Sequence, residues 1–135
     1  MDMRRIVILF VLVFSITAVA QENETMIVRL AEIEVYPQHL KEYLEFANEV
    51  DRLSVEREPG VVCLYPMQSA EDSTKIHILE IYASEKAYQQ HLKTDHFQKY
   101  KQGTLHMVKD LKLPTMKPLD EEMMGNIFQK MRITK

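Results

Sequence analysis

The sequence contains few of the residues that interrupt or cross-link a folded chain. Among its 135 residues are 3 glycines, 5 prolines, 1 cysteine and no tryptophan. The scarcity of glycine and proline, together with a hydrophobic content of 46%, excludes a low-complexity or disordered chain and indicates one globular domain. Because Cys63 is the single cysteine, no intrachain disulfide can form, and packing must hold the fold.

The sequence also has no excess of basic residues and none of the common cofactor motifs. Its 17 basic and 20 acidic side chains are spread along the chain, so we expect no basic face and no nucleic-acid partner. It contains no HExxH, no CxxC and no glycine-rich phosphate loop. His91 and His96 would lie roughly 140° apart on a continuous helix. We therefore expect neither a metal ion nor a nicotinamide or nucleotide cofactor.

Residues 1–20 are typical of a secretory signal peptide. Arg4 and Arg5 precede the apolar run 6–14, and the small residues 18–20 before Gln21 fit a cleavage site. An uncleaved membrane anchor is the alternative, although the apolar run is short for a membrane span. We expect a mature chain that begins at Gln21, is exported to the periplasm or the exterior, and has no membrane contact after cleavage.

The rest of the chain alternates between the periods of strands and helices. Strands are predicted over residues 26–35, 60–68, 75–83 and 111–119, the last at an edge because two prolines interrupt it. An amphipathic helix is predicted from Leu40 to the stop at 58–60. Ser84 should cap a second helix, and Thr94 or Asp95 a third that reaches Val108. The order of elements is thus β, α, β, β, α, β.

The third predicted strand has apolar side chains on both of its faces. One layer of helices covers only one face of a four-stranded sheet, and the chain has no further elements for the other. We therefore expect a homodimer that pairs through its sheets, and a pocket between helices and sheet. The alternating residues are Ile76, Ile78 and Tyr82 on one face, and Leu79, Ile81 and Ala83 on the other.

Residues 120–135 form an amphipathic extension beyond this unit. Four apolar residues recur in it at helical spacing: Met124, Ile127, Phe128 and Met131. We interpret the extension as a capping helix or a clasp of the dimer, and a methionine-rich lid over the pocket is the alternative.

Several motifs together resemble the antibiotic biosynthesis monooxygenase (ABM) family, and in particular its small quinol monooxygenases. They are RLAEI from Arg29, EPG from Glu58, LYPM from Leu64, LEIY from Leu79 and HLKTDHF from His91, and the resemblance spans residues 26–119. It implies an α+β, ferredoxin-like fold (βαββαβ, antiparallel sheet) that dimerises as an α+β barrel. It also implies oxidation of a small electron-rich aromatic such as a quinol by O2, without cofactor.

The chain departs from the family pattern at three positions. Gln38 stands where many relatives have glycine, Tyr82 where many have tryptophan, and Asp95 where a proline is common. Tyr82 keeps an aromatic wall and adds a hydroxyl group, so we expect a pocket of altered selectivity.

The chemistry implied by the resemblance requires a group that removes a proton inside an apolar pocket. His96 is the first candidate for this base, because imidazole titrates near neutral pH and His96 occupies the family-like His-Phe position. Glu80, a carboxylate in an apolar strand, is the second catalytic candidate. The predicted substrate-binding residues are Tyr65, Tyr82, Tyr88 and His91. For each of these residues the alternative is an ordinary structural role, such as packing or a hydrogen bond.

Three other functions stay open. A branch of the same superfamily binds and degrades heme, although Ala31, His91 and Lys101 replace its asparagine, tryptophan and histidine here. Related proteins isomerise small phosphorylated sugar-like molecules. The third alternative is a noncatalytic dimer that only binds an aromatic ligand.

Overall fold

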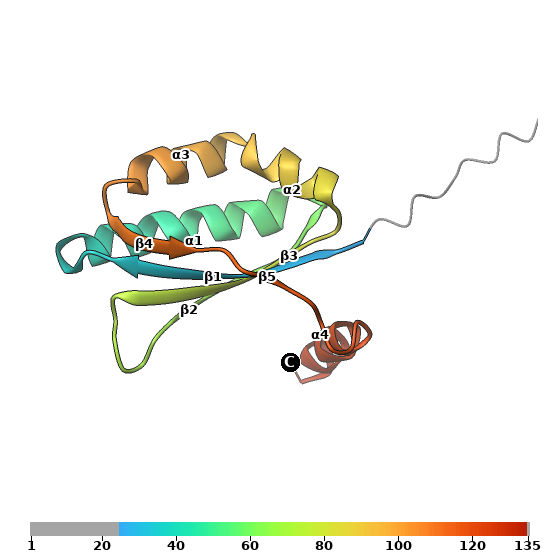
Figure 1. Cartoon of the computed structure of the whole chain (residues 1–135). Coiled ribbons are helices and arrows are strands. Elements are labelled where there is room, and N and C mark those ends of the chain that lie inside the picture. Colours follow the sequence, from blue (N-terminus) through green and yellow to red (C-terminus); the bar gives the residue numbers. More distant parts are fainter. Residues whose placement is uncertain (1–24, 135) are drawn as a thin grey trace, which may run out of the picture.

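The computed structural model describes residues 25–134, which fold into one antiparallel sheet with helices on both sides (Figure 1). The order of elements confirms the predicted α+β, ferredoxin-like fold, whereas the predicted signal peptide lies outside the described residues. The elements are β1 (Ile27–Val35), the 3-10 turn η1 (Pro37–His39), α1 (Leu40–Arg57), β2 (Val61–Gln68), β3 (Lys75–Tyr82), α2 (Glu85–Leu92), α3 (Asp95–Thr104), β4 (Val108–Lys112), β5 (Thr115–Met116) and α4 (Met123–Ile133).

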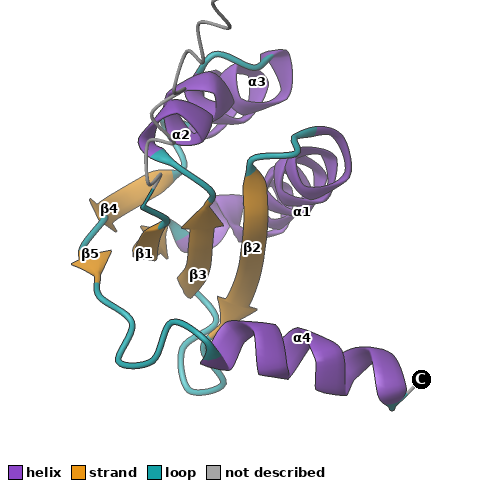
Figure 2. Cartoon of the chain, turned by 90° about the vertical axis from the view of Figure 1, so that its right-hand side faces the viewer, coloured by secondary structure: helices purple, strands orange, loops and turns teal. Residues whose placement is uncertain are grey.

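The sheet has the strand order β2-β3-β1-β4, with β5 also paired to β1. Helices α1, α2 and α3 lie on one face, which we call the helix face, and α4 lies on the other side (Figures 1 and 2). The register pairs Ala31 with Ile78 and Leu30 with Leu79. Because side chains alternate along a strand, Ala31 and Ile78 point toward the helices while Leu30 and Leu79 point to the opposite, open face.

The core lies between the helix face and α1. It is formed by the buried residues Ala31, Ile33, Val35, Tyr43, Ala47, Ile76, Ile78 and Met107. The buried positions of α1 follow one helical stripe: Tyr43, Ala47, Val50, Asp51 and Ser54. Burial of each large apolar side chain contributes about 1.5–3 kcal/mol, so this stripe fixes how α1 sits on the sheet.

Two side-chain caps separate α2 from α3. The Ser84 hydroxyl accepts a hydrogen bond from the Ala87 N–H at 3.1 Å, and the Thr94 hydroxyl accepts one from the Phe97 N–H at 3.3 Å. Both caps confirm the sequence prediction. The backbone of Thr94 is extended, so the helix axis is interrupted there and the chain changes direction.

The last strand differs from the prediction. It begins at Val108, three residues before the predicted start at 111, and α3 ends at Thr104 instead of reaching Val108. The reason is that Val108 pairs with Val35 of β1, a tertiary contact that overrides the helical spacing of the apolar residues. Pro114 then interrupts the strand, although its carbonyl still accepts a hydrogen bond from the Leu30 N–H at 3.2 Å.

Helix α4 contacts one end of the open face. Its residues Met123, Met124 and Ile127 enclose a cavity of about 330 Å³ together with Val28 and Ile81 of the sheet. The rest of the open face is uncovered. Within the described part of the chain, no helix combines the length and apolar character that crossing a membrane requires.

The approach of Gly60 to α2 gives a test of this packing. A Cβ atom at Gly60 would lie 2.4 Å from the Cβ of Ala87, so Gly60→Ala must push β2 and α2 apart. We expect this variant to lose about 1–3 kcal/mol of the free energy of unfolding, measured by urea denaturation. Gly125→Ala is the control, because nothing lies within 4 Å of its added Cβ. Equal stability of Gly60→Ala and the parent chain would contradict the packing described here.

Candidate functional site

A cavity of about 580 Å³ lies between the helix face of the sheet and helices α1, α2 and α3. This is the place where the sequence predicts a pocket. Its apolar wall includes Ala31, Ile33, Leu64, Ile78 and Phe97, and its polar groups include Asp51, Glu80, Tyr82, Tyr88, His91, Gln98, Tyr100 and Lys101. An apolar cavity with a few convergent polar groups is the usual form of a small-molecule site.

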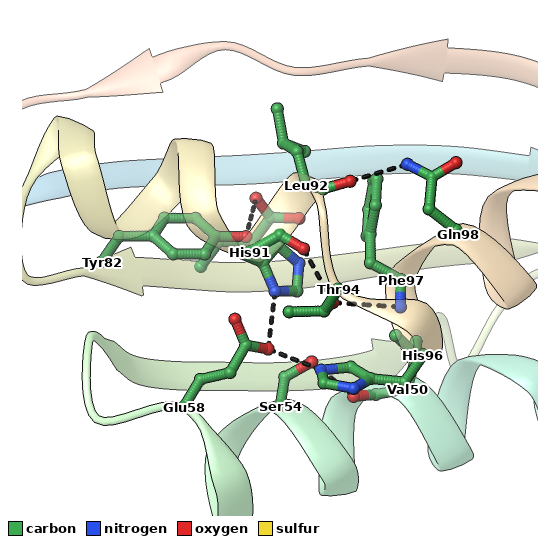
Figure 3. Close-up of polar contacts among 11 residues, drawn as sticks. Val50, Ser54, Glu58, Tyr82, His91, Leu92, Thr94, His96, Phe97 and Gln98 are labelled. Atoms are coloured by element: carbon green, nitrogen blue, oxygen red, sulfur yellow. Dashed lines mark hydrogen bonds and ion pairs between the residues drawn. The ribbon is translucent and has the colours of Figure 1, made fainter.

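A single carboxylate joins the two histidines beside this cavity. The Oε2 atom of Glu58 lies 3.0 Å from Nδ1 of His91 and 2.6 Å from Nε2 of His96 (Figure 3). Burial acts to raise the pKa of Glu58, but the hydrogen bonds from His91 and His96 outweigh it and lower that pKa. Glu58 is therefore an anion that accepts from both rings. Neutral His91 then carries its proton on Nδ1, which leaves the lone pair of Nε2 free to take a proton.

The His91 ring is held by packing as well as by this hydrogen bond. Its centroid lies 5.4 Å from that of Tyr82 and 4.8 Å from that of Phe97. His91 is only 3% exposed, and it lines the cavity. These contacts and the hydrogen bond to Glu58 together hold the His91 imidazole in one orientation.

The local sequence explains how the three side chains meet. Glu58 ends α1 in an extended conformation, immediately before Pro59 and Gly60. The interruption at Thr94 places His91 at the end of α2 and His96 at the start of α3. The expectation that His91 and His96 share no face is therefore wrong, because no continuous helix connects them and their ring nitrogens meet at Glu58.

This cluster also offers ligands that suit a metal ion. The ligand atoms of Glu58, His91 and His96 all lie within 4.8 Å of one another. Two imidazole nitrogens and one carboxylate oxygen are a donor set that suits first-row transition metals, whose binding would replace the hydrogen bonds. The spacing argument against such a site no longer holds.

The structure brings four of the six predicted site residues to the cavity. Glu80, Tyr82, Tyr88 and His91 line it. His96 does not line it and contacts Glu58 instead. Tyr65 is 61% exposed, and its strand position places it on the open face, because its neighbour Leu64 faces the cavity.

Glu80 has a partner within its own strand. The Tyr82 hydroxyl donates a hydrogen bond to Oε2 of Glu80 at 3.2 Å. Burial raises the pKa of Glu80, and this hydrogen bond and the charge of Arg29 only partly offset the rise. The Arg29 guanidinium lies 4.0 Å above the ring centre of Tyr88, so it also stiffens this side of the cavity. The hydrogen bond to Tyr82 is consistent with a structural role for Glu80, the alternative to a catalytic role that the sequence leaves open.

Two tyrosines form a second hydroxyl pair near the cavity. The hydroxyl oxygens of Tyr43 and Tyr100 lie 2.7 Å apart, and Tyr100 lines the cavity. Burial is the main reason that the pKa of Tyr100 rises to about 12. Both hydroxyl groups are therefore protonated at neutral pH.

Sequence reasoning missed Glu58 and Asp51. The sequence indicates Glu58 only as part of a helix stop and of the family-like EPG motif. Asp51 is 7% exposed and lines the cavity, and its Oδ2 atom has no hydrogen-bond partner among the described residues. Burial, followed by the charge of Glu80, raises the pKa of Asp51 to about 7. Its position four residues after Ala47, on the apolar stripe of α1, is a signal that could have identified it.

Comparison with known proteins indicates one family. The family model described as antibiotic biosynthesis monooxygenase matches residues 26–103, a range that includes Glu58, His91 and His96. A solved structure from Bacteroides thetaiotaomicron, provisionally assigned as an antibiotic biosynthesis monooxygenase, is 44% identical, with a TM-score of 0.71. That alignment covers 71% of this chain and 91% of the Bacteroides chain.

More distant solved structures share the fold. Two proteins with the same provisional assignment come from Nitrosomonas europaea and Caulobacter crescentus, at 22% and 20% identity and a TM-score of 0.67 each. The alignments cover 73% and 72% of this chain, and 94% and 92% of those chains. No curated protein matches this chain.

The burial of Asp51 predicts a pH-dependent stability. Its pKa is 3.8 in the unfolded chain and about 7 in the fold, so its contribution is fully present below 3.8 and is lost as the pH rises through 7. Asp51→Asn has no carboxyl group to ionise at this position, so its stability does not fall for this reason as the pH rises. We expect the variant to gain about 2–4 kcal/mol relative to the parent chain between pH 4 and pH 8. Urea denaturation measures the gain, and the exposed Glu45→Gln of the same helix is the control. Parallel pH profiles of Asp51→Asn and the parent would contradict this effect.

Proposed function

The chain belongs to the antibiotic biosynthesis monooxygenase family, and from this premise we propose that it oxidises a small hydroquinone-like aromatic with O2 and no cofactor. The observation that carries the proposal is the Glu58–His91 pair. A buried imidazole faces an apolar cavity of about 580 Å³, and its proton-accepting nitrogen is left free by a hydrogen bond to an anion.

The reaction begins with removal of a phenolic proton. Nε2 of His91 takes the proton, and the Glu58 carboxylate stabilises the imidazolium that forms. Ground-state O2 is a triplet, so a neutral phenol reacts with it slowly, whereas the phenolate donates one electron to give superoxide and an aryloxyl radical.

The radical pair then combines at a ring carbon that carries hydrogen. The peroxide formed there takes up a proton, loses the carbon-bound hydrogen as a proton, and breaks its O–O bond to release water. The sum is dihydroxyarene + O2 → hydroxyquinone + H2O, so the substrate supplies all four electrons that reduce O2. His91 returns to its neutral form in the process.

The lining of the cavity supports this sequence of steps. Apolar side chains exclude water, which keeps the radical pair together and strengthens the electrostatic effect of Glu58. The rings of Tyr82 and Tyr88, 5.1 Å apart, offer aromatic surface for a flat substrate.

His96 is a positioning residue in this proposal. It holds Oε2 of Glu58 at 2.6 Å and does not line the cavity. The base is therefore His91, and the sequence-based choice of His96 is replaced on geometric grounds.

The test is oxygen uptake by the purified chain with 1,4-dihydroxynaphthalene. We expect a rate above the autoxidation of the buffer, with His91→Asn lowering kcat by about 10²–10⁴-fold. His96→Asn should lower it by only about tenfold, because it acts through Glu58. The exposed His106→Asn is the matched control and should keep the parent rate.

Other outcomes would assign other functions. No acceleration with any of a panel of quinols contradicts the proposal. Loss of activity in a chelator, restored by one divalent metal, would transfer the chemistry to a metal at Glu58, His91 and His96. A Soret shift on heme titration would favour the heme branch, and quinol binding without oxygen uptake would favour a noncatalytic binding protein.

We propose further that two copies pair through the open face of the sheet. This face carries the apolar side chains Val28, Leu30, Cys63, Tyr65, Met67, Leu79 and Ile81. Tyr65 and Met67 are exposed in the single chain, and α4 covers only the end near Val28 and Ile81. A contiguous apolar face of this kind is typical of a subunit interface.

Tyr65→Glu tests the dimer by placing a charge on that face, in the edge strand β2. Because Tyr65 is exposed in the single chain, the fold should survive, while the dissociation constant of the dimer should rise about 30-fold or more. Val55→Glu, at another exposed apolar position that lies on α1, is the control. Sedimentation equilibrium measures both. A parent chain that is monomeric at micromolar concentration would overturn this proposal.

A further inference from the structure

Asp51 is a buried acid that the proposed mechanism does not use. It projects from the apolar stripe of α1 into the cavity, where its Oδ2 atom is buried without a hydrogen-bond partner. No ion pair among residues 25–134 involves it. An unpaired acid in the core destabilises a fold, so the position has no structural explanation within the described chain.

No hydrogen bond to Oδ2 of Asp51 is formed among the described residues. Burial is the main reason that the pKa of Asp51 is raised, and the negative charge of Glu80 on β3 raises it further. The Tyr82 hydroxyl donates to Glu80, and the Tyr100 hydroxyl is paired with Tyr43. Because Asp51 lines the cavity, a group that enters the cavity can supply the partner that Asp51 lacks.

We propose that Asp51 accepts a hydrogen bond from a second hydroxyl group of the substrate, so that the cavity selects dihydroxy aromatics whose first hydroxyl meets His91. The inference rests on the proposed function for the identity of the substrate as a phenol. It assigns Asp51 as a specificity-determining residue. Binding measurements alone, without turnover, can test this role.

A hydroxyl group suits this site better than an ammonium group. Lys101 lines the cavity and its positive charge opposes a second cation, whereas a neutral hydroxyl carries no such penalty. A phenolic hydroxyl also gives the Asp51 carboxyl group a donor without adding charge to an apolar cavity. The amino analogue is therefore an arm of the test.

The experiment compares ligands that differ in the second donor only. The probes are 1,4-dihydroxynaphthalene, its monomethyl ether 4-methoxy-1-naphthol, and 4-(aminomethyl)-1-naphthol, whose aliphatic amine is an ammonium group at neutral pH. Their dissociation constants are measured by calorimetry without oxygen, and kcat/KM is measured separately by oxygen uptake. The proteins are the parent chain, Asp51→Leu, which removes the acceptor, and Asp51→Asn, which keeps one acceptor oxygen. Thermal melting confirms that each variant is folded.

We expect the parent chain to bind the diol about 10–100-fold more tightly than the ether, since a hydrogen bond to a carboxylate is lost. Asp51→Leu should bind the two equally, and Asp51→Asn should keep part of the preference. The diol-to-ether ratio of kcat/KM should fall from the parent chain to Asp51→Leu by the same factor as the binding ratio, because the difference in oxidation chemistry between the two compounds is common to both proteins.

Each other result separates the inference from the proposed function. Equal binding of diol and ether by the parent chain, or a preference that Asp51→Leu retains, overturns the role of Asp51 even where oxygen uptake supports the function. A preference that depends on Asp51 without any oxygen uptake overturns the function and keeps the site. Tighter binding of the amine than of the diol, or no binding of any probe, overturns the inference.

Discussion

One carboxylate oxygen, Oε2 of Glu58, connects three segments that are far apart in the chain. It accepts from His91 of α2 and His96 of α3, while its own backbone ends α1. The two hydrogen bonds keep the pKa of Glu58 low despite burial, so the oxygen is an acceptor for both rings at once. A neutral carboxyl could not hold both, because its own proton would compete for a ring nitrogen.

The rest of the cavity depends on where this carboxylate fixes His91. The ring is held between Tyr82 of the sheet and Phe97 of α3, and Phe97 in turn packs near Tyr100 at a centroid distance of 6.3 Å. Tyr100 is bonded to Tyr43 of α1, so aromatic contacts run from the sheet across the helices. A ring constrained from both sides and by its own Nδ1 hydrogen bond can present only Nε2 to a ligand. Pre-organisation of this kind lowers the barrier to proton transfer because no reorganisation is required.

The sequence predicts the helices and strands better than it predicts which of their side chains contact one another. Strand alternation and the Ser84 and Thr94 caps are local properties, and the structure has both. The face on which Tyr65 lies was not predictable. Because β2 has apolar residues on both faces, the alternation of its side chains does not show which face packs against the helices. The role of Glu58 depends on a break in a helix and on contacts with residues 33 and 38 positions away. No spacing rule within one helix contains that information.

The three acids in and beside the cavity differ in their hydrogen-bond partners, and their pKa values shift accordingly. Glu58 receives two hydrogen bonds and its pKa falls, Glu80 receives one and its pKa rises, and Asp51 receives none and its pKa rises to about 7. The side chains are chemically alike, so burial and the number of donors decide which is a permanent anion. A permanent anion suits the support of an imidazolium, whereas an acid without a partner gains most from a ligand that brings a donor. Asp51 is therefore the acid of the three whose environment a ligand can change most.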